Sequence, residues 1–68
     1  MAETLGNRLR EAREAKAWTQ AELAERIGVS RKTVNTVENG VFVPSTVVAL
    51  KLAGALECRV EDLFFLPE

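Results

Sequence analysis

A short glycine turn between two segments of helical spacing is the feature that most constrains the fold. Leu23 and Ile27 lie on one apolar face, Gly28 follows at once, and Ser30 comes two positions later. Glycine suits the left-handed residue that ends a helix, and serine is a favourable N-cap for the next one. Because so short a turn holds two helices at a steep angle, a helix-turn-helix is predicted over about residues 19–38.

Helical spacing of apolar residues continues over most of the chain. Thr19 and Glu22 fit a capping box, Asn39 and Gly40 form a turn signal, and Ser45 is a further N-cap. On the fourth helix, Leu50 is expected to join the core with its apolar neighbours. No strand hairpin is expected. The predicted helices span about residues 4–16, 20–26, 31–38, 46–56 and 60–65.

The length predicts one domain, residues 1–68, with a C-terminal tail at 65–68. The longest apolar runs have four residues, against the roughly 20 that span a bilayer, and no signal peptide is evident. A cytoplasmic protein without a membrane segment is therefore expected.

The inventory of reactive side chains argues against catalysis. The chain has no histidine or tyrosine and one cysteine, Cys58. An ordinary zinc site needs three or four clustered ligands, a nucleophile needs an activating base, and no Gly-rich phosphate loop is present. We expect no enzyme, no cofactor and no metal.

The charge distribution is more informative than the net charge of −1. A nucleic-acid binder usually carries a basic excess, so the total argues mildly against one. Locally, however, residues 26–36 contain three cations and no acid.

The third predicted helix has a polar outer face. With Val34 and Val37 inward, the residues left outward are Arg31, Lys32, Thr33, Asn35 and Thr36. All can hydrogen-bond, and in a DNA-binding helix-turn-helix this helix lies in the major groove. Arginine suits guanine, asparagine suits adenine, and the threonine methyl suits the thymine methyl. Any solvated helix also carries polar residues, so this face alone leaves that alternative open.

Three motifs stand at regular intervals: Thr-Gln-x-Glu-Leu-Ala from Thr19, Gly-Val-Ser from Gly28 and Val-Glu-Asn-Gly from Val37. With them the chain, from about Leu5 to Phe64, resembles the Cro/cI-type (XRE) helix-turn-helix domain of bacterial, archaeal and phage repressors. The resemblance implies an all-α, compact five-helix, lambda-repressor-like fold that binds operator DNA, commonly as a dimer.

The resemblance also implies roles for single residues. The positions that would read bases are Arg31, Lys32, Asn35 and Thr36. Those that would contact DNA phosphates are Gln20, Ser30 and Asn39. Arg13 would pair with Glu38 and so orient the third helix, and a buried carboxylate does need such a partner.

The chain departs from the family pattern at several positions. Ala17 and Glu57 stand where relatives often have glycine, and a left-handed backbone there would cost roughly 1 kcal/mol each. Trp18 replaces the usual leucine and is expected in the core.

The loop after Gly40 is apolar where many relatives are basic or polar, which predicts fewer phosphate contacts and a flatter salt dependence. We expect an exposed apolar patch there that marks a homodimer interface, although these residues could instead fold into the core. The candidate interface residues are Phe42, Val43, Val47, Phe65 and Leu66.

The sequence therefore predicts a sequence-specific, double-stranded-DNA-binding transcriptional regulator, a homodimeric repressor of a palindromic operator. Two alternatives stay open. One is a protein-interaction module such as an antitoxin, with a protein partner, which the acidic total and the apolar loop favour. The other is the N-terminal DNA-binding part of a longer, ligand-responsive regulator.

Overall fold

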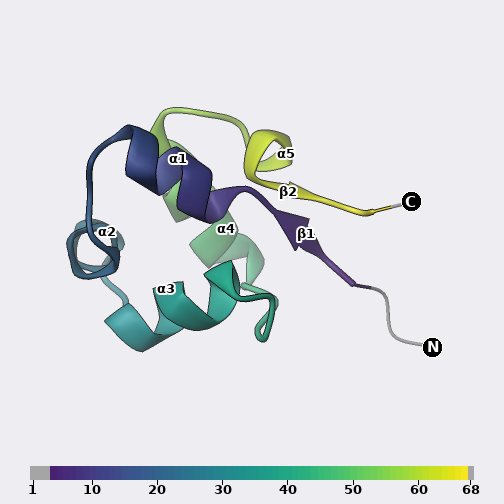
Figure 1. The fold of residues 1–68 in the computed structure, drawn as a ribbon, viewed down its shortest axis with the longest axis horizontal. Coiled ribbons are helices and arrows are strands. Elements are labelled where there is room, and N and C mark those ends of the chain that lie inside the picture. The colour runs from purple at the N-terminus through teal and green to yellow at the C-terminus, as the bar shows by residue number, and fades with distance from the viewer. Residues whose placement is uncertain (1–3, 68) are drawn as a thin grey trace.

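Five helices form most of the computed structural model, which describes residues 4–67 (Figure 1). The helices are α1 (Leu9–Ala15), α2 (Gln20–Ile27), α3 (Arg31–Glu38), α4 (Thr46–Leu56) and α5 (Val60–Leu63). Two short strands, β1 (Gly6–Asn7) and β2 (Phe64–Phe65), pair antiparallel. The predicted all-α, five-helix, lambda-repressor-like architecture is confirmed.

The strand pair corrects three expectations from the sequence. The first helix begins at Leu9 rather than near residue 4, the fifth ends at Leu63 rather than near 65, and a pairing of strands exists where none was expected. The reason is tertiary: Gly6 faces Phe65 in the ladder, and the Arg8 amide donates to the Leu63 carbonyl over 2.8 Å. These backbone groups are satisfied across the sheet and not along a helix.

Apolar side chains from all five helices meet in one core. α2 packs against α3 and α4, and α4 packs against α5. The buried core residues are Leu9, Leu23, Ala24, Ile27, Val34, Val37, Leu52, Ala53, Leu56, Leu63 and Phe64. Leu50 is an exception to the prediction, since it is 59% exposed. Within residues 4–67, no helix is long and apolar enough to cross a membrane.

Two helix ends adopt the left-handed backbone without a glycine. Ala17 has φ of 60° and Glu57 has φ of 57°, so both positions keep the left-handed backbone without the glycine that relatives often have there. Trp18 is partly buried and packs against the core. The outer face of its ring carries the Arg26 guanidinium, 4.0 Å from the ring centroid, so this tryptophan both seals the core and holds a surface cation.

Candidate nucleic-acid interface

The helix-turn-helix is formed by capping interactions that the sequence encodes. Thr19 accepts from the Glu22 amide over 3.0 Å, and Glu22 accepts from the Thr19 amide over 2.7 Å. Gly28 ends α2 with φ of 74°, and the Ser30 hydroxyl caps α3 by accepting from the Thr33 amide over 3.2 Å. The turn therefore sets the direction of α3 locally, as predicted.

Two valines attach α3 to the core. Val34 and Val37 are each 2% exposed, whereas Arg31 and Lys32 at the start of the helix are exposed to solvent. Asn35 and Thr36 lie further along and are partly buried. In Figure 1, α3 forms the lower edge of the molecule, on the side opposite α5. Its outer face is thus most accessible to a partner at the N-terminal turn.

Asn35 accepts hydrogen bonds from two other predicted DNA contacts. The Gln20 Nε2 group donates to its Oδ1 over 3.2 Å, and so does the Asn39 Nδ2 group over 3.2 Å. Gln20 belongs to α2 and Asn39 ends α3, so the network links both helices of the motif. Since its Oδ1 already accepts twice, the Nδ2 group is the part of the Asn35 amide left to donate to a partner.

Glu38 lies beneath this network, with its side chain 0% exposed. The Arg13 Nε donates to its Oε2 over 2.6 Å, and the Gln20 Nε2 donates to its Oε1 over 3.0 Å. Arg13 also donates from Nη1 to the Trp18 carbonyl over 2.7 Å. The fold thus brings together Arg13 and Glu38, which the resemblance paired.

The charge state of Glu38 follows from these contacts. Burial raises the pKa of its carboxyl, but hydrogen bonds from Arg13 and Gln20 and the Arg13 charge outweigh burial and leave the pKa below its usual range. The same hydrogen bond raises the pKa of Arg13. Glu38 therefore stays ionised near neutrality and anchors the C-terminal turn of α3 to α1.

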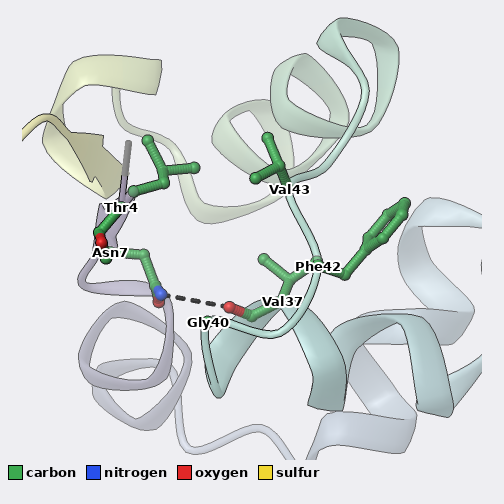
Figure 2. Close-up of a pocket in the computed structure, with 7 residues that line it drawn as sticks. Thr4, Asn7, Val37, Gly40, Phe42 and Val43 are labelled. Atoms are coloured by element: carbon green, nitrogen blue, oxygen red, sulfur yellow. Dashed lines mark hydrogen bonds between the residues drawn. The ribbon is translucent and has the colours of Figure 1, made fainter. Parts of the chain in front are cut away.

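Arg10 and Asn7 belong to this site, although the sequence did not single them out. Arg10 donates to Glu38 over 3.4 Å and to the Asn39 Oδ1 over 3.3 Å. Asn7 donates from Nδ2 to the Val37 carbonyl over 3.1 Å (Figure 2). Arg10 precedes Arg13 by one helical turn, a spacing that could have identified it. Asn7 gave no such signal, because its contact depends on the β1–β2 pairing.

The candidate interface residues lie on three different elements. Phe42 and Val43 are 51% and 64% exposed, and Val47 on α4 is 61% exposed. Phe42 and Val43 line a hollow with Thr4 and Asn7 (Figure 2). Leu66 is 65% exposed, so the alternative of a place in the core does not hold for these four residues.

Phe65 is partly buried, and its ring lies against Arg8 and Gly6 of its own chain. The Arg8 guanidinium lies 4.5 Å from the ring centroid. On Gly6, a Cβ atom would lie 2.3 Å from the ring Cε2. Phe65 thus serves mainly to close the strand pair over the core.

Comparison with known proteins agrees with this geometry. The helix-turn-helix family model matches residues 9–63. The HTH-type transcriptional regulator YgzD of Bacillus subtilis is 40% identical over 62 residues, which cover 91% of this chain and 94% of YgzD. The competence pilus inhibition repressor of Acinetobacter baylyi is 33% identical over 64 residues, which cover 94% of this chain and 58% of that repressor.

A solved structure gives the same result at the level of the fold. The restriction-modification controller protein C.AhdI of Aeromonas hydrophila superimposes with a TM-score of 0.77 at 44% identity, covering 81% of this chain and 83% of that protein. The residues that the family model matches, 9–63, include all five helices. The chain therefore belongs to the Cro/cI-type (XRE) helix-turn-helix family of DNA-binding transcriptional regulators.

Proposed function

We propose that the protein is a sequence-specific repressor that binds a palindromic operator as a homodimer, with α3 in the major groove. The observation that carries this proposal is the outer face of α3: it is polar, contains no acid before Glu38, and is held outward by Val34 and Val37. A helix of this kind, preceded by a tight glycine turn, fits the groove with its first residues against base edges.

The exposed cations at the start of α3 are assigned to base reading. Arg31 has the planar fork that guanine accepts at O6 and N7, and Lys32 can reach the same acceptors. Asn35 offers its Nδ2 donor to a base acceptor, and Thr36 offers its methyl group to a thymine. These contacts would specify sequence.

The phosphate contacts are assigned to the groups around these residues. The first amide groups of α3, next to Ser30, have no partner within the helix and favour an anion. Gln20 and Asn39 both donate to the Asn35 Oδ1. On binding, each of these side chains would replace a hydrogen bond to Asn35 or Glu38 by one to a DNA phosphate. This replacement would couple binding of the DNA backbone to base reading by Asn35.

Homodimerisation follows from the requirements of affinity and from the exposed apolar side chains. One recognition helix reads few base pairs, and two half-sites about one helical turn apart give the specificity that regulators need. Val43 and Val47, close together in the chain on the loop and α4, are the strongest candidates for the contact. The Acinetobacter relative is named as a repressor, which agrees with the repressor function proposed here. We infer in addition that the protein acts in the cytoplasm and is not an enzyme.

The test is enrichment of a random duplex library on the purified protein at moderate salt. A palindromic motif is the expected result, and no enrichment by the folded protein would overturn the proposal. Asn35→Ala should then weaken binding by about 1–3 kcal/mol and relax specificity at one or two base pairs. Arg59→Ala, which removes an exposed polar side chain at the start of α5, is the control and should leave specificity unchanged.

A protein-interaction module such as an antitoxin is the second candidate, favoured by the exposed side chains Val41, Phe42 and Val43. It predicts recovery of a stoichiometric protein partner with no retention of DNA. The library enrichment distinguishes the two candidates directly.

A further inference from the structure

Beside the polar face of α3, the surface becomes apolar. An open hollow of about 310 Å³ is lined by Ser30, Lys32, Thr33, Thr36, Val41 and Phe42. The first four belong to α3 and its N-cap, and the last two belong to the loop that follows. The hollow is therefore continuous with the proposed DNA-reading surface and extends it beyond the helix.

The loop is tied to α3 by its backbone. The amides of Val41 and Phe42 both donate to the Thr36 carbonyl, over 2.9 and 3.2 Å. Val41 is 78% exposed and Phe42 is 51% exposed. In Figure 2 the Phe42 ring points away from Thr4 and Asn7. The two apolar side chains are thus held beside the last turn of α3 without being part of the core.

The hydroxyl groups around the hollow are already engaged within the protein. The Thr36 hydroxyl donates to the carbonyls of Lys32 and Thr33, each over 3.0 Å. The hydroxyls of Ser30 and Thr33 share a hydrogen bond over 3.0 Å. What remains for a partner is the carbon surface of the threonines, Val41 and Phe42. This surface suits an apolar group and not a hydrogen-bonding base edge.

We propose that this hollow receives the C5-methyl group of a thymine in the bound duplex, which makes Val41 and Phe42 specificity-determining residues. The inference rests on the proposed DNA binding. Among the groups that base pairs present in the major groove, the thymine methyl is the apolar one. Lys32 lines the hollow and carries a positive charge, and no acid lies between Arg26 and Val37, so the charge around the hollow also matches DNA.

The first experiment needs only the unchanged protein and its enriched duplex. Each thymine is replaced in turn by deoxyuridine, which removes the methyl group and nothing else, and the dissociation constant is measured. One thymine per half-site should lose about fourfold in affinity, the value of one buried methyl group. At that position, 5-methylcytosine should bind more tightly than cytosine by a similar factor.

The second experiment assigns the methyl contact to the loop. In the double variant Val41→Ala with Phe42→Ala, the thymine and deoxyuridine duplexes should bind with nearly equal affinity. Leu50→Ala is the matched control, because Leu50 is also an exposed apolar residue, at 59%, but does not line the hollow. This variant should keep the fourfold difference in affinity between the thymine and deoxyuridine duplexes. Val41→Ala alone provides a milder variant, with an intermediate ratio expected.

The outcomes separate this inference from the function on which it rests. If no duplex is enriched, the proposed function fails and the thymine contact fails with it. If a duplex is enriched but no thymine is sensitive to loss of its methyl, or the double variant keeps the ratio, only the assignment of the hollow is overturned. A change in the molar mass of the DNA-free double variant would show that the hollow contacts a second copy instead, which also overturns it.

Discussion

At the scale of single residues, Glu38 is the point on which the polar contacts beneath α3 converge. Its side chain is 0% exposed and accepts from Arg13, Gln20 and Arg10. A buried carboxylate stabilises a fold only while its partners remain in place. The same contacts connect α1, α2 and α3, so Glu38 couples the stability of the protein to the position of the reading helix.

The lowered pKa of Glu38 predicts a pH dependence of stability. The pKa of Glu38 is lower in the folded protein than in the unfolded chain. The ionised Glu38 therefore stabilises the fold fully above the ordinary glutamate pKa of about 4.3, and this stabilisation is lost as the pH falls through the folded-state pKa. Urea unfolding of the wild type should therefore show a falling midpoint in the acid range. Glu38→Gln should be less stable than the wild type at pH 7, and its urea midpoint should change less as the pH falls.

Glu22 provides the comparison for that measurement. Its pKa is also lowered, by hydrogen bonds from the backbone and side chain of Thr19, but it lies in solvent. Glu22→Gln should flatten the acid profile less than Glu38→Gln. An equal effect of both substitutions would mean that burial beneath α3 gives Glu38 no special weight.

Ala17 predicts a stabilising substitution. It holds φ of 60° without being glycine, which costs roughly 1 kcal/mol. Ala17→Gly should therefore raise the melting temperature, by about 4–8 °C for 1 kcal/mol in a domain of this size. Ala15→Gly, in the right-handed backbone of α1, is the control and should lower it. A decrease in both variants would contradict the strain assigned to Ala17.

At the scale of elements, the pairing of β1 and β2 depends on Gly6 having no side chain. On Gly6, a Cβ atom would lie 2.3 Å from the Phe65 Cε2, and the ring is backed by Arg8. Gly6→Ala should lower the free energy of unfolding by about 1–3 kcal/mol, the usual range for overpacking, measured by thermal or urea unfolding.

A double-mutant cycle identifies the cause of that loss. In a Phe65→Ala background the ring is absent, so adding Gly6→Ala should cost much less than it does in the wild type. An unchanged cost would show that the backbone of β1, and not the ring of Phe65, makes glycine necessary.

The helices were largely predictable from the sequence, and the strands were not. Capping residues such as Thr19, Ser30 and Ser45 act within one turn of their own position, so α2, α3 and α4 begin where the sequence indicates. The β1–β2 ladder joins residues almost sixty positions apart, and two-residue strands have no periodicity to detect. The helical spacing around Leu5 was therefore extended too far toward the N-terminus.

At the scale of the whole molecule, the distribution of exposed apolar residues predicts self-association. Val47 is 61% exposed on the first turn of α4. A charge placed inside an apolar contact is strongly unfavourable, so Val47→Asp should shift the protein toward monomer and weaken operator binding. Sedimentation equilibrium over a range of concentrations measures this directly.

The neighbouring Thr46 gives the control for charge. Thr46→Asp adds the same charge at the exposed start of α4, where the helix dipole favours it, and should leave the association unchanged. A wild type that stays monomeric at all concentrations, or a Val47→Asp protein that associates as before, would place the dimer contact elsewhere.

The sequence by itself determined the helices, the glycine turn, the polar face of α3 and the family, because each depends on local spacing or on a motif of adjacent residues. Tertiary structure alone decided the strand pair, the exposure of Leu50 and the roles of Arg10 and Asn7. It also decided that Gln20 of α2 bonds to Asn35 of α3. These features depend on which surfaces meet in space, and residues distant in the chain carry no local sign of that meeting.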